Sequence, residues 1–175
     1  GELAVTSISK NLVHVFYLSE KYRKLSLEGA EQIKPQPINH AAVLGAGVMG
    51  GGIAQAFSNK DIFTRLKDIH LDAVAKGFQA AGKIYTDALK KRRMKKHEVE
   101  AKMARITGTT DYSGFQYVDL VVEAVVENMD VKKKVFKELS EKTNPNAILA
   151  TNTSALSVTE MAKETRDPSK VIGIH

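Results

Sequence analysis

The chain contains no cysteine and no tryptophan, and aromatic residues make up only 6% of its 175 positions. Without cysteine, disulfides, thiolate metal sites and a cysteine nucleophile are excluded, and a reducing compartment is compatible with the sequence. No apolar run approaches the roughly 20 residues that a membrane-spanning helix needs, so no span is predicted. The N-terminus lacks the basic-then-apolar pattern of a signal peptide, and we expect a cytoplasmic protein. No metal site is predicted, because His14, His40, His70 and His97 have no mutual spacing that indicates one.

Positive charge is in excess, with a formal net charge of +6 and a sequence pI of about 9.4. Much of this excess lies in residues 90–96 and 132–134. A nucleic-acid surface is one interpretation, but aromatic residues that would stack on bases are not interleaved with the basic ones. We therefore favour a solvated helix end, with an attraction for a polyanionic substrate as the next alternative.

The chain is predicted to consist of two parts. Residues 6–24 have apolar side chains at spacings of three and four, which predicts an amphipathic helix whose apolar face something should cover. A polar stretch with Pro35 and Pro37 then indicates a linker. We expect a linker helix with its linker at 1–37 and one domain at 38–175.

Strand and helix patterns alternate through the second part. Strands are predicted at 41–44, 62–66, 106–110, 118–126, 147–150 and 171–174, with helices around 53–57, 69–91, 97–103, 130–142 and 157–165. This order predicts an α/β fold with a doubly wound, mostly parallel sheet. The continuous apolar strand at 118–126 is typical of a sheet covered on both faces. Glu123 within it needs a buried partner or a missing part of the protein.

A glycine turn, Gly45-Ala46-Gly47-Val48-Met49-Gly50, follows the first of these strands. Gly45 allows the tight turn, Gly47 lets the main chain approach a pyrophosphate, and Gly50 lets helix and strand pack closely. The helix that opens there presents amide groups and a positive dipole end to phosphates. The pattern predicts a dinucleotide site, with a plain glycine-tightened turn as the alternative.

An acidic residue, Asp68, ends the second strand at 68 − 50 = 18 positions beyond Gly50. A carboxylate about 20 residues on binds the ribose hydroxyls of the adenosine. It also repels a 2′-phosphate, which favours NAD over NADP. Arg65 and Lys67 weaken that preference, unless they are solvated residues of the strand.

Several segments, read together and in this order, resemble the 3-hydroxyacyl-CoA dehydrogenase family. They are the glycine turn continued to Ala54, Lys67-Asp68, residues 121–128, Thr151-Asn152-Thr153-Ser154 and Gly173-Ile174-His175. The resemblance implies a Rossmann-like NAD-binding domain over most of 38–175. Residues 1–37 resemble the segment that joins an enoyl-CoA hydratase domain to this dehydrogenase in the α subunit of the bacterial fatty-acid β-oxidation complex. A hydratase domain would then cover the apolar helix.

The resemblance also implies roles for individual residues. The glycine turn with Val48 and Met49 would hold the pyrophosphate, and Asp68 the adenosine ribose. The nicotinamide-ribose side would be lined by Val125, Val126, Glu127 and Lys132. Ser154 would meet the nicotinamide or the substrate's 3-hydroxyl, and His175 would be the catalytic base.

The resemblance implies oxidation of (S)-3-hydroxyacyl-CoA to 3-oxoacyl-CoA with hydride transfer to NAD. It also implies a multifunctional enzyme of lipid degradation whose second activity, enoyl-CoA hydratase, is that of a lyase. A thiolase β subunit and a second copy of the chain are possible partners, in bacterial cytoplasm. The family pairs its histidine with a glutamate about a dozen residues later, so we expect a piece of a longer protein that binds NAD weakly and turns over negligibly. The alternatives are a small β-hydroxyacid dehydrogenase and a non-catalytic NAD-binding relative.

Each assignment has a simpler interpretation. His175 can be an ordinary strand-end histidine, and Ser154 a cap of the next helix or turn. Glu127 can be a first-turn carboxylate at a helix N-terminus, and Lys132 a solvated surface residue.

Overall fold

The computed structural model describes residues 6–23 and 33–175. The chain divides into two compact units, residues 1–37 and 38–175. The first unit contains α1, Ser7–Arg23, which confirms the predicted helix except for its last residue, which lies outside the described residues. Residues 28–32 of the predicted linker also lie outside them, and 33–37 form neither helix nor strand.

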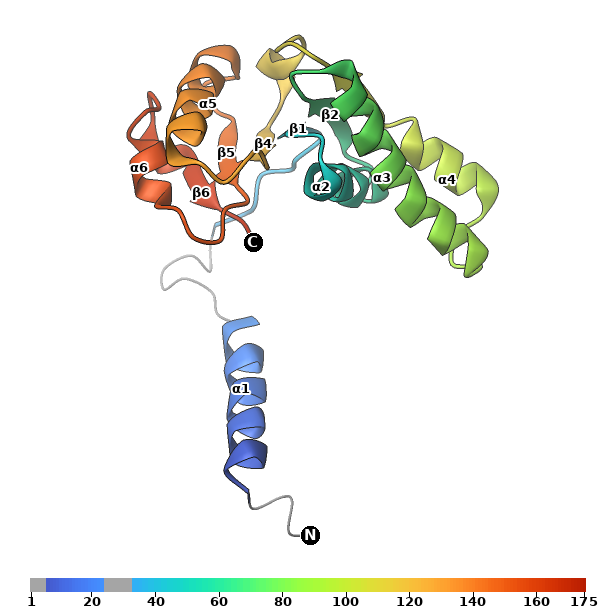
Figure 1. Cartoon of the computed structure of the whole chain (residues 1–175), viewed down its shortest axis with the longest axis vertical. Coiled ribbons are helices and arrows are strands. Elements are labelled where there is room, and N and C mark those ends of the chain that lie inside the picture. Colours follow the sequence, from blue (N-terminus) through green and yellow to red (C-terminus); the bar gives the residue numbers. More distant parts are fainter. Residues whose placement is uncertain (1–5, 24–32) are drawn as a thin grey trace. The chain divides into compact units, whose positions relative to one another are not determined.

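The second unit is built on a six-stranded sheet in the described residues, and all neighbouring strands are parallel (Figure 1). Its order is β3-β2-β1-β4-β5-β6. The strands are β1 (His40–Leu44), β2 (Phe63–Lys67), β3 (Ile106–Thr109), β4 (Leu120–Glu123), β5 (Ile148–Thr151) and β6 (Val171–Gly173). The helices are α2 (Val48–Asn59), α3 (Leu71–Lys90), α4 (Lys96–Met103), α5 (Met129–Lys142) and α6 (Val158–Ala162), with 3-10 turns η2 (Phe115–Tyr117) and η3 (Pro168–Lys170). The predicted Rossmann-like architecture is confirmed.

Helices cover both faces of this sheet, which explains its continuous apolar strands (Figure 1). In β1, Val43 packs with Ala54 of α2 and Ala81 of α3. Its neighbours Ala42 and Leu44 point the other way, into a cluster that includes side chains of α5 and α6. Side chains alternate between the faces of a strand, so each apolar run supplies both cores.

One predicted strand, 118–126, is longer than the observed β4. Pairing with β1 and β5 ends at Glu123, whose partners are Leu44 and Thr151. The Glu123 carboxylate then accepts a hydrogen bond from the amide of Val125 at 2.7 Å. Because this side chain binds the Val125 amide, that amide does not pair with a neighbouring strand. The strand therefore ends at Glu123 and a loop follows.

Helix α2 begins earlier than predicted, at Val48 rather than near Ile53, and so includes three consecutive glycines. Close packing accounts for them: a Cβ on Gly51 would lie 2.6 Å from the carbonyl oxygen of Gly77 in α3. The turn after α2 places Asp61 at a φ of 66°, in the left-handed region that aspartate tolerates better than most residues.

Candidate functional site

A cleft of about 560 Å³ lies where the strand order reverses, between β1 and β4 at their carboxyl ends. Open α/β sheets bind their ligands at this position, because the connections on either side run to opposite faces. Five of the residues singled out from the sequence line it: Gly45, Gly47, Asp68, Val125 and Val126. Segments that are distant in the sequence therefore form one site.

The glycine turn has the geometry that its sequence predicts. Gly45 has a φ of +93°, and a Cβ there would lie 2.4 Å from the carbonyl oxygen of Ala124. Gly47 is the N-cap of α2, has no side chain with which to cap it, and would direct a Cβ into open space. The first amides of a helix lack partners within it. Val48 and Met49, both exposed, begin the helix, so this end can receive an anion.

Asp68 ties the second strand to the glycine turn. Its Oδ2 accepts a hydrogen bond from the amide of Ala46 at 2.7 Å, and its Oδ1 accepts one from the amide of Ile69 at 2.7 Å. A carboxylate has about four acceptor positions, so each oxygen keeps capacity for a further donor. Because the half-buried side chain also lines the cleft, it can accept bonds from ligand hydroxyls.

Of the two basic residues of β2, Lys67 is buried, so its interpretation as a solvated residue is wrong, whereas Arg65 is partly exposed. Arg65 donates from Nε and Nη2 to the carbonyl and hydroxyl oxygens of Ser113 at 3.0 and 2.7 Å. Lys67 is 8% exposed, and its Nζ lies 4.5 Å from the ring centroid of Tyr112. The Tyr112 hydroxyl donates to Glu138, and burial raises the pKa of Tyr112 far above its usual value, so the phenol stays neutral.

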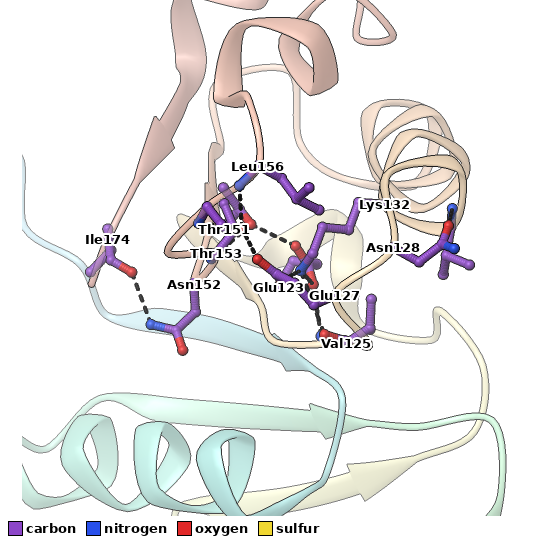
Figure 2. A network of polar contacts seen from close by, with 12 residues as sticks. Glu123, Val125, Glu127, Asn128, Lys132, Thr151, Asn152, Thr153, Leu156 and Ile174 are labelled. Carbon is purple, nitrogen blue, oxygen red and sulfur yellow. Dashed lines mark hydrogen bonds and ion pairs between the residues drawn. The ribbon is translucent and has the colours of Figure 1, made fainter.

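Glu123 has its buried partner within this chain (Figure 2). Its Oε1 lies 2.7 Å from Nζ of Lys132, and the two side chains are 0% and 1% exposed. The interpretation of Lys132 as a solvated surface residue is therefore wrong. The sequence did carry a signal: Val135, Phe136 and Leu139 follow Lys132 at spacings that put all four on one apolar helix face.

Glu127 is held at the edge of this ion pair by a second set of contacts. Its carboxylate accepts a hydrogen bond from the Thr153 hydroxyl and lies 3.3 Å from Nζ of Lys132. The bond from Thr153, with Lys132 second, lowers the pKa of Glu127. The alternative interpretation of Glu127 as a first-turn carboxylate is wrong. Glu127 precedes the N-cap of α5, which is Asn128, and the Asn128 side chain accepts from the amide of Val131. Glu127 is thus an exposed carboxylate beside the cleft-lining Val126.

The C-terminal segment is fixed to the loop after β5. The amide of Ile174 donates to the carbonyl of Thr151 at 2.9 Å. Nδ2 of Asn152 donates to the carbonyl of Ile174, also at 2.9 Å (Figure 2). His175 therefore leaves the sheet at its carboxyl edge and is exposed, like Ser154 of the neighbouring loop.

The simpler interpretation of Ser154 as a helix cap is wrong. Ser157 caps α6 by accepting from the amide of Glu160, and Thr153 accepts from the amides of Ala155 and Leu156. Among the residues that the structure describes, no group of histidines, carboxylates and cysteines could hold a metal ion. No helix in the described ranges is long and apolar enough to cross a membrane.

Residues 40–175 match a family model described as the NAD-binding domain of 3-hydroxyacyl-CoA dehydrogenase. A fatty acid oxidation complex subunit alpha of Idiomarina loihiensis is 37% identical over 100% of this chain and 25% of its own length. The crystal structure of an (S)-3-hydroxybutyryl-CoA dehydrogenase of Ralstonia eutropha is 34% identical with a TM-score of 0.77, over 79% of this chain and 49% of the other. The crystal structure of a 3-hydroxybutyryl-CoA dehydrogenase of Escherichia coli is 31% identical with a TM-score of 0.77, over 80% of this chain and 30% of the other. The chain spans about a quarter of the length of the curated relatives it matches.

Proposed function

The chain belongs to the 3-hydroxyacyl-CoA dehydrogenase family through its NAD-binding domain, and from that membership we propose that it serves the oxidation of (S)-3-hydroxyacyl-CoA to 3-oxoacyl-CoA. The observation that carries the proposal is the cleft shared by Gly47 and Asp68. It combines a backbone that a ligand can approach closely with a carboxylate that still accepts hydrogen bonds. NAD fits these groups, and its nicotinamide supplies the hydride acceptor.

The adenosine half of the cofactor is assigned to the glycine turn and β2. The amides at the start of α2, with Val48 and Met49, hold the pyrophosphate, and the Asp68 carboxylate accepts from the ribose hydroxyls. Arg65 donates to Ser113 through Nε and Nη2, so its guanidinium group is already engaged. A 2′-phosphate would then face the Asp68 carboxylate without a compensating positive charge from Arg65. This arrangement supports a preference for NAD over NADP.

The nicotinamide half is assigned to the loops after β4 and β5. Val125 and Val126 line the cleft and give an apolar wall, and Glu127 offers an ionised carboxylate beside it. Lys132 is also assigned to this end of the site. It is buried behind the loop after β4, where its ammonium group pairs with Glu123 and Glu127. The exposed Ser154 hydroxyl is assigned to the nicotinamide or the substrate's 3-hydroxyl.

His175 is assigned the role of general base. Oxidising a secondary alcohol requires removal of the hydroxyl proton while the hydride departs. A neutral imidazole nitrogen accepts that proton and returns it in the reverse direction. Such a base contributes roughly 10²–10⁴ in rate. Its position at the carboxyl edge of β6, fixed through Ile174, supports this role.

A CoA ester is favoured over a small β-hydroxyacid by the basic end of the α3–α4 hairpin. The lysines and arginines there are exposed and form one polycationic turn: Lys90, Lys91, Arg92, Arg93, Lys95 and Lys96. The phosphates of a CoA ester are a chemical match for that charge, whereas a small hydroxyacid offers one carboxylate.

The larger context is also proposed from the relatives. Residues 1–37 are assigned as the linker helix and linker from a hydratase domain, and 38–175 as the dehydrogenase's nucleotide domain. A multifunctional enzyme of fatty-acid oxidation in bacterial cytoplasm, with a thiolase β subunit as partner and a second copy as a further contact, is consistent with relatives named as complex subunits.

Calorimetric titration with NAD and NADP tests the cofactor assignment. Asp68→Ala should weaken NAD binding about tenfold or more, the equivalent of one charge-assisted hydrogen bond, and narrow the preference over NADP. Asp72→Ala is the matched control, because Asp72 is an exposed aspartate in the first turn of α3 outside the cleft lining. Preferential binding of NADP by the unmodified chain, or equal NAD affinities for the two variants, would overturn the assignment.

A further inference from the structure

We propose that Glu123 is a positioning residue that holds the two loops at the nicotinamide end in register without touching the cofactor. The inference rests on the proposed function, since it concerns the same cleft. Glu123 is fully buried at the end of β4, directly below the loop that lines the cleft. The reaction itself assigns no role to this carboxylate.

The Glu123 carboxylate joins three separate segments (Figure 2). Oε1 accepts from the amide of Val125 in the loop after β4 and from Nζ of Lys132 in α5, each at 2.7 Å. Oε2 accepts from the hydroxyl of Thr151, at the end of β5, at 2.7 Å. Burying the Glu123 carboxylate costs desolvation free energy. That cost is offset only when every hydrogen-bond and ion-pair partner is in place.

A second route returns from Lys132 to the β5 loop. Its ammonium group lies 3.3 Å from Glu127, and Glu127 accepts from the hydroxyl of Thr153. Thr153 is two residues beyond Thr151, so the loops after β4 and β5 are connected twice. The backbone of Thr151 also receives the amide of Ile174, which precedes His175. One buried pair therefore connects the cleft wall, the Ser154 loop and the proposed base.

The adenosine end is held by different contacts. There, Asp68 binds the amide of Ala46, and the amide of Gly45 donates to the carbonyl of Lys67. None of these bonds involves Glu123, Lys132 or Thr151. Loss of one bond in this network should therefore weaken binding of the ligand part that contacts the nicotinamide end. Binding of an adenosine diphosphate moiety should not change.

The experiment uses the full-length dehydrogenase and measures binding of NAD, binding of ADP-ribose, and kcat with a 3-hydroxyacyl-CoA. Thr151→Val keeps the shape of a fully buried side chain and removes the hydroxyl that Glu123 accepts from. Thr151→Ser restores a hydroxyl. Thr143→Val is the matched control, because Thr143 is also buried but donates to Leu139 in α5, outside the network.

Thr151→Val should lower kcat up to about 100-fold and weaken NAD binding several-fold, since misplacement of reacting groups by about 1 Å costs that much. ADP-ribose affinity should remain within twofold of the unmodified enzyme, and Thr151→Ser should recover most of kcat. Thr143→Val should change none of the three values.

Equal losses of NAD and ADP-ribose affinity in Thr151→Val would overturn the inference, because they would indicate general damage to the fold. Kinetics like those of Thr143→Val would overturn it as well. Both results leave the proposed function standing, whereas failure of the unmodified enzyme to bind NAD or oxidise the substrate would refute that function instead.

Discussion

Two glycines in the first turns of α2 should respond oppositely to the same substitution. A Cβ at Gly50 would lie 1.7 Å from the carbonyl oxygen of Gly45, whereas at Gly52 its nearest neighbour would be Cδ1 of Ile84 at 4.0 Å. We expect Gly50→Ala to destabilise the domain and Gly52→Ala to stabilise it, although both sit in the same helix.

The magnitudes follow from these distances. Real Cβ atoms essentially never come within 3.0 Å of another heavy atom, so the turn at Gly45 must move by 3.0 − 1.7 = 1.3 Å. Overpacking costs about 1–3 kcal/mol, and because the obstacle here is backbone, we expect Gly50→Ala to cost about 3 kcal/mol. Gly52→Ala should gain about 0.5–1 kcal/mol, because alanine loses less backbone entropy in a helix.

Thermal and urea unfolding of the two variants measure the difference. For a chain of this size, about 1 kcal/mol shifts Tm by roughly 2–4 °C. Gly50→Ala should therefore lower Tm by about 6–12 °C, and Gly52→Ala should raise it by about 1–4 °C. Titration with NAD should show lost binding only for Gly50→Ala, because only that variant displaces the glycine turn. Equal Tm values for the two variants would refute the close approach of α2 to the turn.

Three further predictions concern charged groups. Lys132→Met should lower the free energy of unfolding by about 3–5 kcal/mol, because it leaves a buried carboxylate without its cation, whereas Lys133→Met, which removes a partly exposed partner of α6, should hardly move the urea midpoint. The hydroxyl and amide of Ser113 lower the pKa of Asp111 from 3.8 to about 2, so its contribution to stability is present above about pH 4 and is lost as the pH falls toward 2; a ¹³C NMR titration should show this midpoint, and Ser113→Ala should raise it. In the full-length enzyme, His175→Gln should lower kcat by about 10²–10⁴-fold with the Kd for NAD unchanged, and undiminished turnover would favour a non-catalytic relative.

Local signals in the sequence were sufficient to predict the order of the elements and the glycine turn and Asp68, which line the cleft. The apolar alternation of residues 41–44, the glycine turn and the spacing to Asp68 each depend on neighbours along the chain, and the structure has the corresponding strand, turn and cleft. Backbone propensity and side-chain periodicity are local properties, so they can be read without knowing which elements meet.

The tertiary structure decided how the polar groups are partnered. Lys132 and Thr151 lie nine and 28 positions from Glu123, on a helix and on a neighbouring strand, and Arg65 meets Ser113 across 48 positions. No local pattern encodes such pairs, because they exist only once the strand order brings their elements together. The glycine turn could be predicted from the sequence alone, whereas the buried contacts of Glu123 behind the loop after β4 required the packed sheet, because a desolvated carboxylate must have such partners.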